Sequence, residues 1–137
     1  MTAVLEKTKD NELYTSSVLI PAPGDVNYSI TLESADEGGI LDIIYIGYGS
    51  SDEITCGRYI QCFWLLSNSL SSISTILNST NSEESETFTI SLSAKGSANK
   101  VLINLAVGGE TSAESRGVMY VRGYLKNGHI YNLQLDT

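Results

Sequence analysis

Residues 26–33 read Val-Asn-Tyr-Ser-Ile-Thr-Leu-Glu, so an apolar side chain alternates with a polar one at every step. Residues 87–93, Thr-Phe-Thr-Ile-Ser-Leu-Ser, follow the same alternation. Successive side chains of a β-strand point to opposite faces, so a period of two gathers the apolar groups on one face. These two stretches predict half-buried strands with one face toward water, and they decide the fold class.

Further strand signals extend outward from these two stretches. Residues 40–48 are apolar at both parities apart from Asp42, which predicts a central strand covered on both faces. Residues 101–107, 117–125 and 130–135 are the other strand candidates. Short apolar runs at this spacing are typical of an antiparallel all-β domain.

Turn residues separate these strands. Pro21-Ala22-Pro23-Gly24-Asp25 breaks the chain between the first two strands, because proline removes a backbone donor and glycine permits a tight turn. Residues 94–99 predict a longer hairpin loop. Residues 126–129, Lys-Asn-Gly-His, predict a tight hairpin, because Asn-Gly suits the two positive φ angles of a type I′ turn.

Residues 59–77 allow two structures. Their large apolar residues fall at spacings of four and three, which fits one face of a helix. The stretch is also rich in serine and threonine, which are mediocre helix formers. The alternative is a strand over 58–66 and another over about 72–77, separated by Ser67-Asn68-Ser69, and we favour it. The chain is therefore expected to form an antiparallel β-sandwich, jelly-roll-like, with eight or nine short strands and at most one helix.

The length of 137 residues fits one domain, which we place at residues 13–137, after a flexible N-terminal arm at residues 1–12. The net charge of -8 repels phosphate groups, and no basic stripe offsets it. We therefore expect neither nucleic acid nor a membrane surface as a partner. The first residues turn charged before a signal-peptide core could form, so we expect synthesis in a cytoplasm without a signal peptide.

Catalytic groups are scarce in this sequence. His129 is the one histidine, and its place after the Asn-Gly turn predicts a side chain facing water. The paired acids are adjacent in sequence, so they do not face each other across a cleft. Cys56 and Cys62 lack zinc-ligand spacing and are expected to be free thiols. We therefore expect no enzyme, no cofactor and no metal site, although calcium binding by the acidic loops near residues 52–53 and 83–86 stays open.

The tyrosines are the main candidates for recognition, because tyrosine offers a large rigid surface with a polar tip. Trp64 is expected in the core, and it would serve as a sugar-stacking platform only if it faced outward. In the arm, an apolar pair could contact a neighbouring subunit. The interface or ligand candidates are Val4, Leu5, Tyr14, Tyr48, Tyr120, Tyr124 and Tyr131.

The strand segments after residue 40 follow a recognisable order and composition. They run through Gly57-Arg58-Tyr59-Ile60-Gln61-Cys62-Phe63-Trp64-Leu65-Leu66, then residues 87–93, 101–105 and 117–124. Over residues 40–125 the chain resembles the small β-sandwich structural proteins of tailed bacteriophages, namely head decoration (cement) proteins and tail-fibre tip domains. The resemblance implies a structural role in symmetric assemblies, as trimers or on capsid lattices, without catalysis or cofactor.

Two functions follow as hypotheses. The first is a non-catalytic structural or adhesive β-sandwich in a phage particle, such as a capsid decoration protein, assembled into the virion. Its partners would be itself, as a homo-oligomer such as a trimer, and other particle proteins. The alternative is a carbohydrate-binding, lectin-like module whose partners are glycans, because sandwich sheets can present aromatic residues to sugar rings.

Overall fold

The computed structural model describes residues 13–21, 23–49, 54–67, 69–82, 86–95, 99–109 and 114–136. Within these ranges the chain forms nine strands and no helix, which confirms the predicted fold class. In order, the strands are β1 (Leu13–Ile20), β2 (Gly24–Leu32), β3 (Glu37–Tyr48), β4 (Ile54–Leu66), β5 (Ser69–Ser82), β6 (Glu86–Ala94), β7 (Lys100–Gly109), β8 (Ser115–Leu125) and β9 (Ile130–Leu135). Nothing in the described part of the chain qualifies as a membrane-spanning helix.

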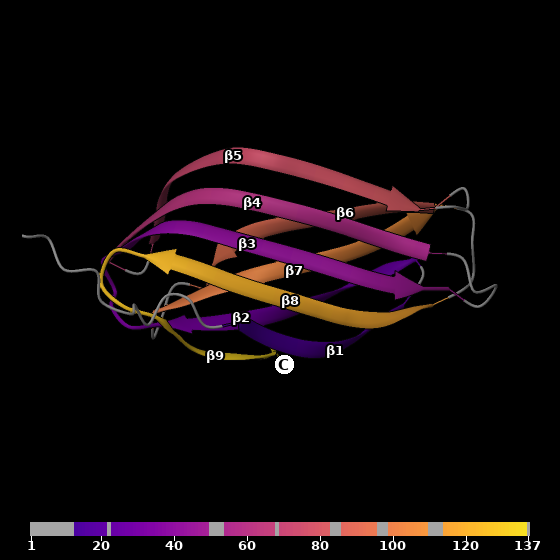
Figure 1. The fold of residues 1–137 in the computed structure, drawn as a ribbon, viewed down its shortest axis with the longest axis horizontal. Coiled ribbons are helices and arrows are strands. Elements are labelled where there is room, and N and C mark those ends of the chain that lie inside the picture. The colour runs from indigo at the N-terminus through magenta and orange to yellow at the C-terminus, as the bar shows by residue number, and fades with distance from the viewer. Residues whose placement is uncertain are drawn as a thin grey trace, which may run out of the picture.

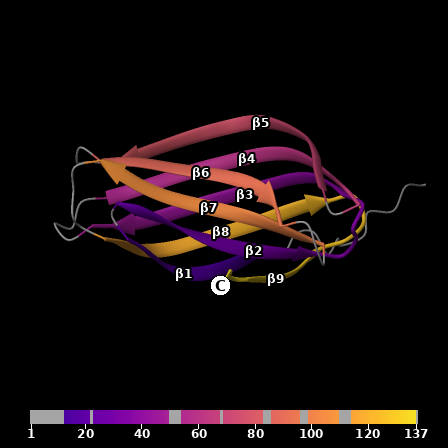
Figure 2. The same ribbon diagram turned by 180° about the vertical axis from the view of Figure 1, so that it is seen from behind.

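The strands form two antiparallel sheets that pack face to face. One sheet has five strands in the order β1-β8-β3-β4-β5, and it lies toward the viewer in Figure 1. The other has four strands in the order β6-β7-β2-β9, and it lies toward the viewer in Figure 2. The nested pairing of β1 with β8 and β2 with β7 is jelly-roll-like. The sheet departs from a strict jelly roll where β3, β4 and β5 follow one another as hairpins.

The core fills the space between the two sheets. It is built from the inward positions of eight strands, because alternate side chains of a half-buried strand point to one face. Tyr45 of β3 stacks on Phe88 of β6 with ring centroids 5.1 Å apart, so this contact joins the sheets directly. The largest fully buried side chains are Tyr45, Ile20, Ile30, Leu32, Leu41, Ile43, Leu65, Ile90, Ile103, Leu105, Met119 and Ile130.

The segment that allowed both a helix and strands forms β4 and β5. The two strands pair along most of their length, and the turn between them begins at Ser67, whose φ is 48°. The strand alternative is thus confirmed, but the break is shorter than the predicted 67–69, because Ser69 is already the first residue of β5. β5 is an edge strand, and its register against β4 shifts twice, once beside Ile60 and Gln61 and once beside Trp64 and Leu65.

The predicted hairpin at residues 126–129 is wrong. β8 belongs to the five-stranded sheet and β9 pairs with β2 in the other sheet, so the chain crosses between sheets here. The crossing is held by Glu37, whose Oε1 accepts a hydrogen bond from the Asn127 N–H at 3.0 Å. Asn127 Nδ2 also donates to the Asp36 carbonyl at 2.6 Å. Neither Asn127 nor Gly128 adopts a positive φ, so a type I′ turn is absent.

Candidate functional site

The outward face of the four-stranded sheet is polar. The outward residues of β6 are serines and threonines, all exposed. On the neighbouring strands, Asn104 Nδ2 donates to Asp25 Oδ2 at 2.8 Å and to Asn27 Oδ1 at 3.1 Å. This face therefore presents hydrogen-bonding groups to water, as the outside of a solvated sheet does.

The outward face of the five-stranded sheet, called the outer face below, is much more apolar. It carries most of the exposed large apolar side chains among the described residues. They are Leu13, Leu19, Ile46, Tyr48, Ile54, Trp64, Leu66, Leu77 and Tyr124. Exposed apolar surface on this scale marks an interaction site in soluble proteins.

The prediction that residues 40–48 are covered on both faces is wrong for the part of the chain that the structure describes. Leu41, Ile43 and Tyr45 of β3 are fully buried in the core. The alternate residues point outward, where Ile46 and Tyr48 are about half exposed. No described segment packs over them, so the sequence encodes an apolar second face that the described chain leaves open.

Four of these residues form an end patch where β3 ends and β4 begins. The end patch consists of Leu19, Ile46, Tyr48 and Ile54, and each side chain is between 49% and 53% exposed. Tyr48 lies directly opposite Ile54 on β4 and opposite Arg116 on β8. The Arg116 guanidinium pairs with Glu114, and this contact raises its pKa through hydrogen bonding and the carboxylate charge.

Trp64 lies at the opposite end of the outer face, so the expectation that it belongs to the core is wrong. Its neighbours Phe63 and Leu65 point into the core, and strand alternation therefore turns Trp64 outward, 39% exposed. The ring lies over Gly38, where an added Cβ would come within 2.5 Å of Trp64 Cε3. Lys126 Nζ lies 4.6 Å from the ring centroid, within cation–π range.

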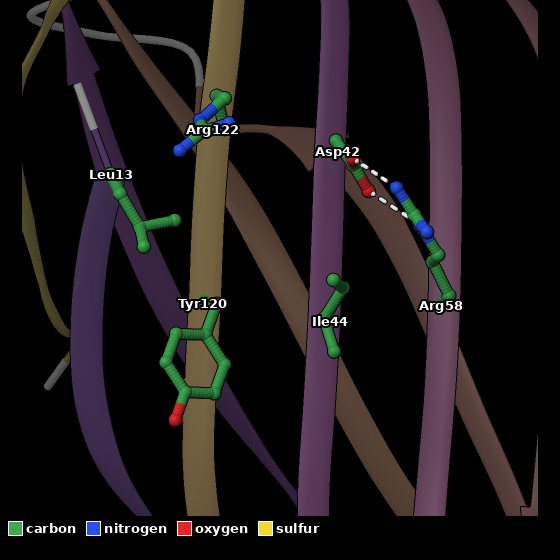
Figure 3. A pocket seen from close by; sticks show the side chains of 6 residues that line it. All are labelled: Leu13, Asp42, Ile44, Arg58, Tyr120 and Arg122. Atoms are coloured by element: carbon green, nitrogen blue, oxygen red, sulfur yellow. Dashed lines mark hydrogen bonds and ion pairs between the residues drawn. The ribbon is translucent and has the colours of Figure 1, made fainter. Parts of the chain in front are cut away.

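A central hollow lies between these two ends, and Figure 3 shows the side chains that line it. It has a volume of about 250 Å³ and draws its lining from four adjacent strands. The lining residues are Leu13 of β1, Tyr120 and Arg122 of β8, Asp42 and Ile44 of β3, and Arg58 of β4. The hollow therefore combines apolar walls with three charged groups.

The charges of the central hollow are arranged around Asp42. Arg58 binds it in a bidentate manner, with Nε 3.1 Å from Oδ1 and Nη2 2.7 Å from Oδ2 (Figure 3). Hydrogen bonding to Asp42 and its negative charge raise the pKa of Arg58. Arg122 lies opposite Asp42 on the other neighbouring strand, and its Nε is buried without a hydrogen-bond partner among the described residues. The hollow thus holds two positive charges and one negative charge.

The structure brings three of the predicted recognition residues to the outer face: Tyr48, Tyr120 and Tyr124. Tyr14 instead points inward against the core, and its hydroxyl donates to the Ile130 carbonyl. Tyr131 lies on β9 of the other sheet and is exposed. Val4 and Leu5, together with the rest of the predicted arm, lie outside the described residues.

Sequence reasoning missed Arg58, Arg122 and Asp42 as a group. The signal that could have found them is Asp42 itself, the one charged residue in the apolar run of residues 40–48. An acid at that position of a strand needs a partner, because burying a charge is costly unless it is paired.

His129 is less exposed than predicted. Its side chain is 20% exposed, its Nδ1 lies 4.0 Å from Glu33 Oε2, and its ring packs against Tyr131 with centroids 4.8 Å apart. Cys56 and Cys62 both lie on β4 without a disulfide. The described residues contain no group of three or more metal-binding side chains, and both acidic loops considered for calcium lie largely outside them.

Comparisons with known proteins give little to set beside this geometry. No protein-family model matches the sequence, and no curated protein matches it. Among solved structures, the tailspike protein of Acinetobacter phage vB_ApiP_P1 is similar over 99% of this chain, with 19% sequence identity and a TM-score of 0.43. The chain spans 24% of that tailspike chain. The similarity is a loose likeness of all-β architecture.

Proposed function

We propose that this chain is a non-catalytic structural or adhesive β-sandwich of a phage particle, such as a capsid decoration protein. In this proposal it assembles as a homo-oligomer and contacts neighbouring copies through the end patch. The phage assignment rests on the resemblance carried by residues 40–125. The assembly role has a physical basis in the exposed apolar surface.

The observation that carries the assembly role is the contrast between the two outward faces. The outward serines and threonines of β6 are stable in contact with water. The end patch, by contrast, leaves four large apolar side chains about half exposed. Burying an apolar side chain fully is worth about 1.5–3 kcal/mol, so each half-exposed residue gains roughly half of that in an interface. A second copy of the chain provides the same patch in return.

The test is the solution mass of the purified protein, measured by light scattering across a concentration series. We expect a closed oligomer for the unaltered chain. The double variant Ile46→Ser and Ile54→Ser is expected to be monomeric, because it removes two apolar residues from the end patch. Its matched control is Ile76→Ser, which removes an equally exposed isoleucine from β5, away from the patch. An unaltered chain that stays monomeric at every concentration overturns the homo-oligomer proposal.

The carbohydrate-binding alternative is the second candidate, and one observation favours it. Trp64 faces outward rather than inward, on the same face as Tyr120 and Tyr124. Aromatic rings on an open sheet can stack against the apolar face of a sugar. A glycan array that is positive for the unaltered chain and blank for Trp64→Ala would support this candidate. An array that is blank for both proteins would count against it.

A further inference from the structure

We propose that the central hollow binds the carboxylate of a uronic-acid-type sugar unit, with Arg122 holding the carboxylate and Asp42 accepting hydrogen bonds from the sugar hydroxyls. The inference rests on the carbohydrate-binding candidate and names its ligand class. The hollow adjoins the end patch, since Ile44 of the hollow and Ile46 of the end patch are successive outward residues of β3, but the two regions share no residue.

Charge is unevenly distributed over the chain. The chain has a net charge of -8, yet all three of its arginines, Arg58, Arg116 and Arg122, project from the outer face. Asp42 is the one acid at the outward positions of these five strands among the described residues. Arg58 is paired with Asp42 and Arg116 with Glu114, so Arg122 is the arginine of this face whose charge is left to attract an anion.

The two arginines of the hollow are paired unequally. Arg58 has both of its contacting nitrogens on the Asp42 carboxylate, so its charge is already compensated. The Nε of Arg122 is buried and has no hydrogen-bond partner among the residues that the structure describes. A buried donor without a partner is costly, and an incoming carboxylate would satisfy it with a charge-assisted hydrogen bond.

Asp42 retains hydrogen-bonding capacity beyond its contact with Arg58. A carboxylate offers about four acceptor positions, and Arg58 occupies two of them. A ligand that suits the hollow therefore carries a carboxylate together with hydroxyl donors. Uronic acids combine both groups on one ring, whereas an acidic protein side chain brings the carboxylate without the hydroxyls.

The size and shape of the hollow also limit the ligand. The hollow, at about 250 Å³, is smaller than the roughly 300–1,000 Å³ typical of pockets for drug-sized ligands, so it suits one sugar unit. Tyr120 and Ile44 line it with apolar surface against which a pyranose ring can pack (Figure 3). Its open side leaves room for a glycan chain to continue along the outer face.

The experiment compares methyl glucuronide with methyl glucoside, which differ in a carboxylate against a hydroxymethyl group. Binding is followed by saturation-transfer NMR on the full chain at low salt. We expect the glucuronide to bind and the glucoside to bind at least tenfold more weakly. Arg122→Met is expected to weaken glucuronide binding by about 10- to 100-fold, because a charged hydrogen bond is lost. Arg116→Met is the matched control, since Arg116 lies on the same face outside the hollow, and it should bind as the unaltered chain does.

Other results would overturn the inference in distinct ways. Equal binding of the two sugars would refute the carboxylate site and leave the carbohydrate-binding function standing. Absence of binding by both sugars, together with a blank glycan array, would refute both. If N-acetylglutamate amide bound as tightly as the glucuronide with the same dependence on Arg122, the site would be one for protein carboxylates instead. Circular dichroism of each variant verifies that it is folded.

Discussion

Replacing Tyr45 by phenylalanine tests how the two sheets are held together. Tyr45 is fully buried, and its hydroxyl lies 2.8 Å from the Oγ of Ser115, which is also buried. The Tyr45→Phe variant keeps the ring stacked on Phe88 and leaves the serine hydroxyl without its partner. An unsatisfied buried polar group costs about 1–3 kcal/mol, so we expect the free energy of unfolding to fall by that amount.

The two partners can be separated by a double-mutant cycle. Ser115→Ala alone should cost a similar amount, because it leaves the Tyr45 hydroxyl unsatisfied. The double variant Tyr45→Phe and Ser115→Ala should lose much less than the sum of the two single losses, because neither polar group remains to be desolvated. For a domain of this size, each kcal/mol corresponds to about 4 °C in melting temperature.

The assay is urea unfolding at neutral pH, followed by far-ultraviolet circular dichroism. The reasoning is refuted if Tyr45→Phe loses less than about 0.5 kcal/mol, or if the double variant loses the full sum, since coupled partners in direct contact are not additive. The control is Tyr131→Phe, which removes a hydroxyl from an exposed ring on β9 and is expected to change stability little.

Three further predictions concern other properties of buried residues on β3. Burial raises the pKa of Tyr45, and its hydrogen bond to Ser115 opposes this effect. The free energy of unfolding should therefore fall as the pH rises above the usual tyrosine pKa of about 10. Urea midpoints measured between pH 8 and 11 should fall less steeply for Tyr45→Phe than for the unaltered chain. Gly47→Ala should cost about 1–3 kcal/mol in urea unfolding, because its Cβ would lie 2.2 Å from the Tyr45 hydroxyl, and an unchanged midpoint would contradict this. Glu37→Ala removes the acceptor for the N–H groups of Gly38 and Asn127 and should cost about 1–3 kcal/mol, whereas Glu37→Gln, which keeps one acceptor oxygen, should lose less in the same assay.

The sequence predicts the strands well because alternation is a local property. Residues 26–33 and 87–93 alternate, and the structure places their apolar side chains inward. Sheet membership is less accessible, because it depends on distant contacts. The Asn-Gly pair at residues 127–128 has the local signal of a hairpin, yet Glu37, 90 residues away from Asn127, holds it in a crossing between sheets.

In the candidate site, too, one residue can be predicted from a local sequence signal and the others depend on distant contacts. Asp42 stands out in the sequence as a charge within an apolar strand. Arg58 and Arg122 are brought next to Asp42 only by the strand register. The register sets Arg122 opposite Asp42 and Arg58 opposite Ile44. No pattern along the chain encodes that three-strand alignment, because it results from two separate pairings of β3. Trp64 was misplaced for a related reason, since an apolar run on β4 does not by itself reveal which parity faces the core.

The uncharged edge strand β5 affects how the protein is expected to aggregate. It is an edge strand of 14 residues, Ser69–Ser82, and contains no charged residue and no proline. Natural proteins commonly guard such edges with lysine or proline, because an open row of backbone groups is a template for pairing with another molecule. In β5 the protection against such pairing comes from the two register shifts against β4, which twist the edge strand. This protection depends on backbone geometry and not on charge, so added salt does not screen it. Aggregation through this edge should therefore depend on protein concentration and temperature more than on ionic strength.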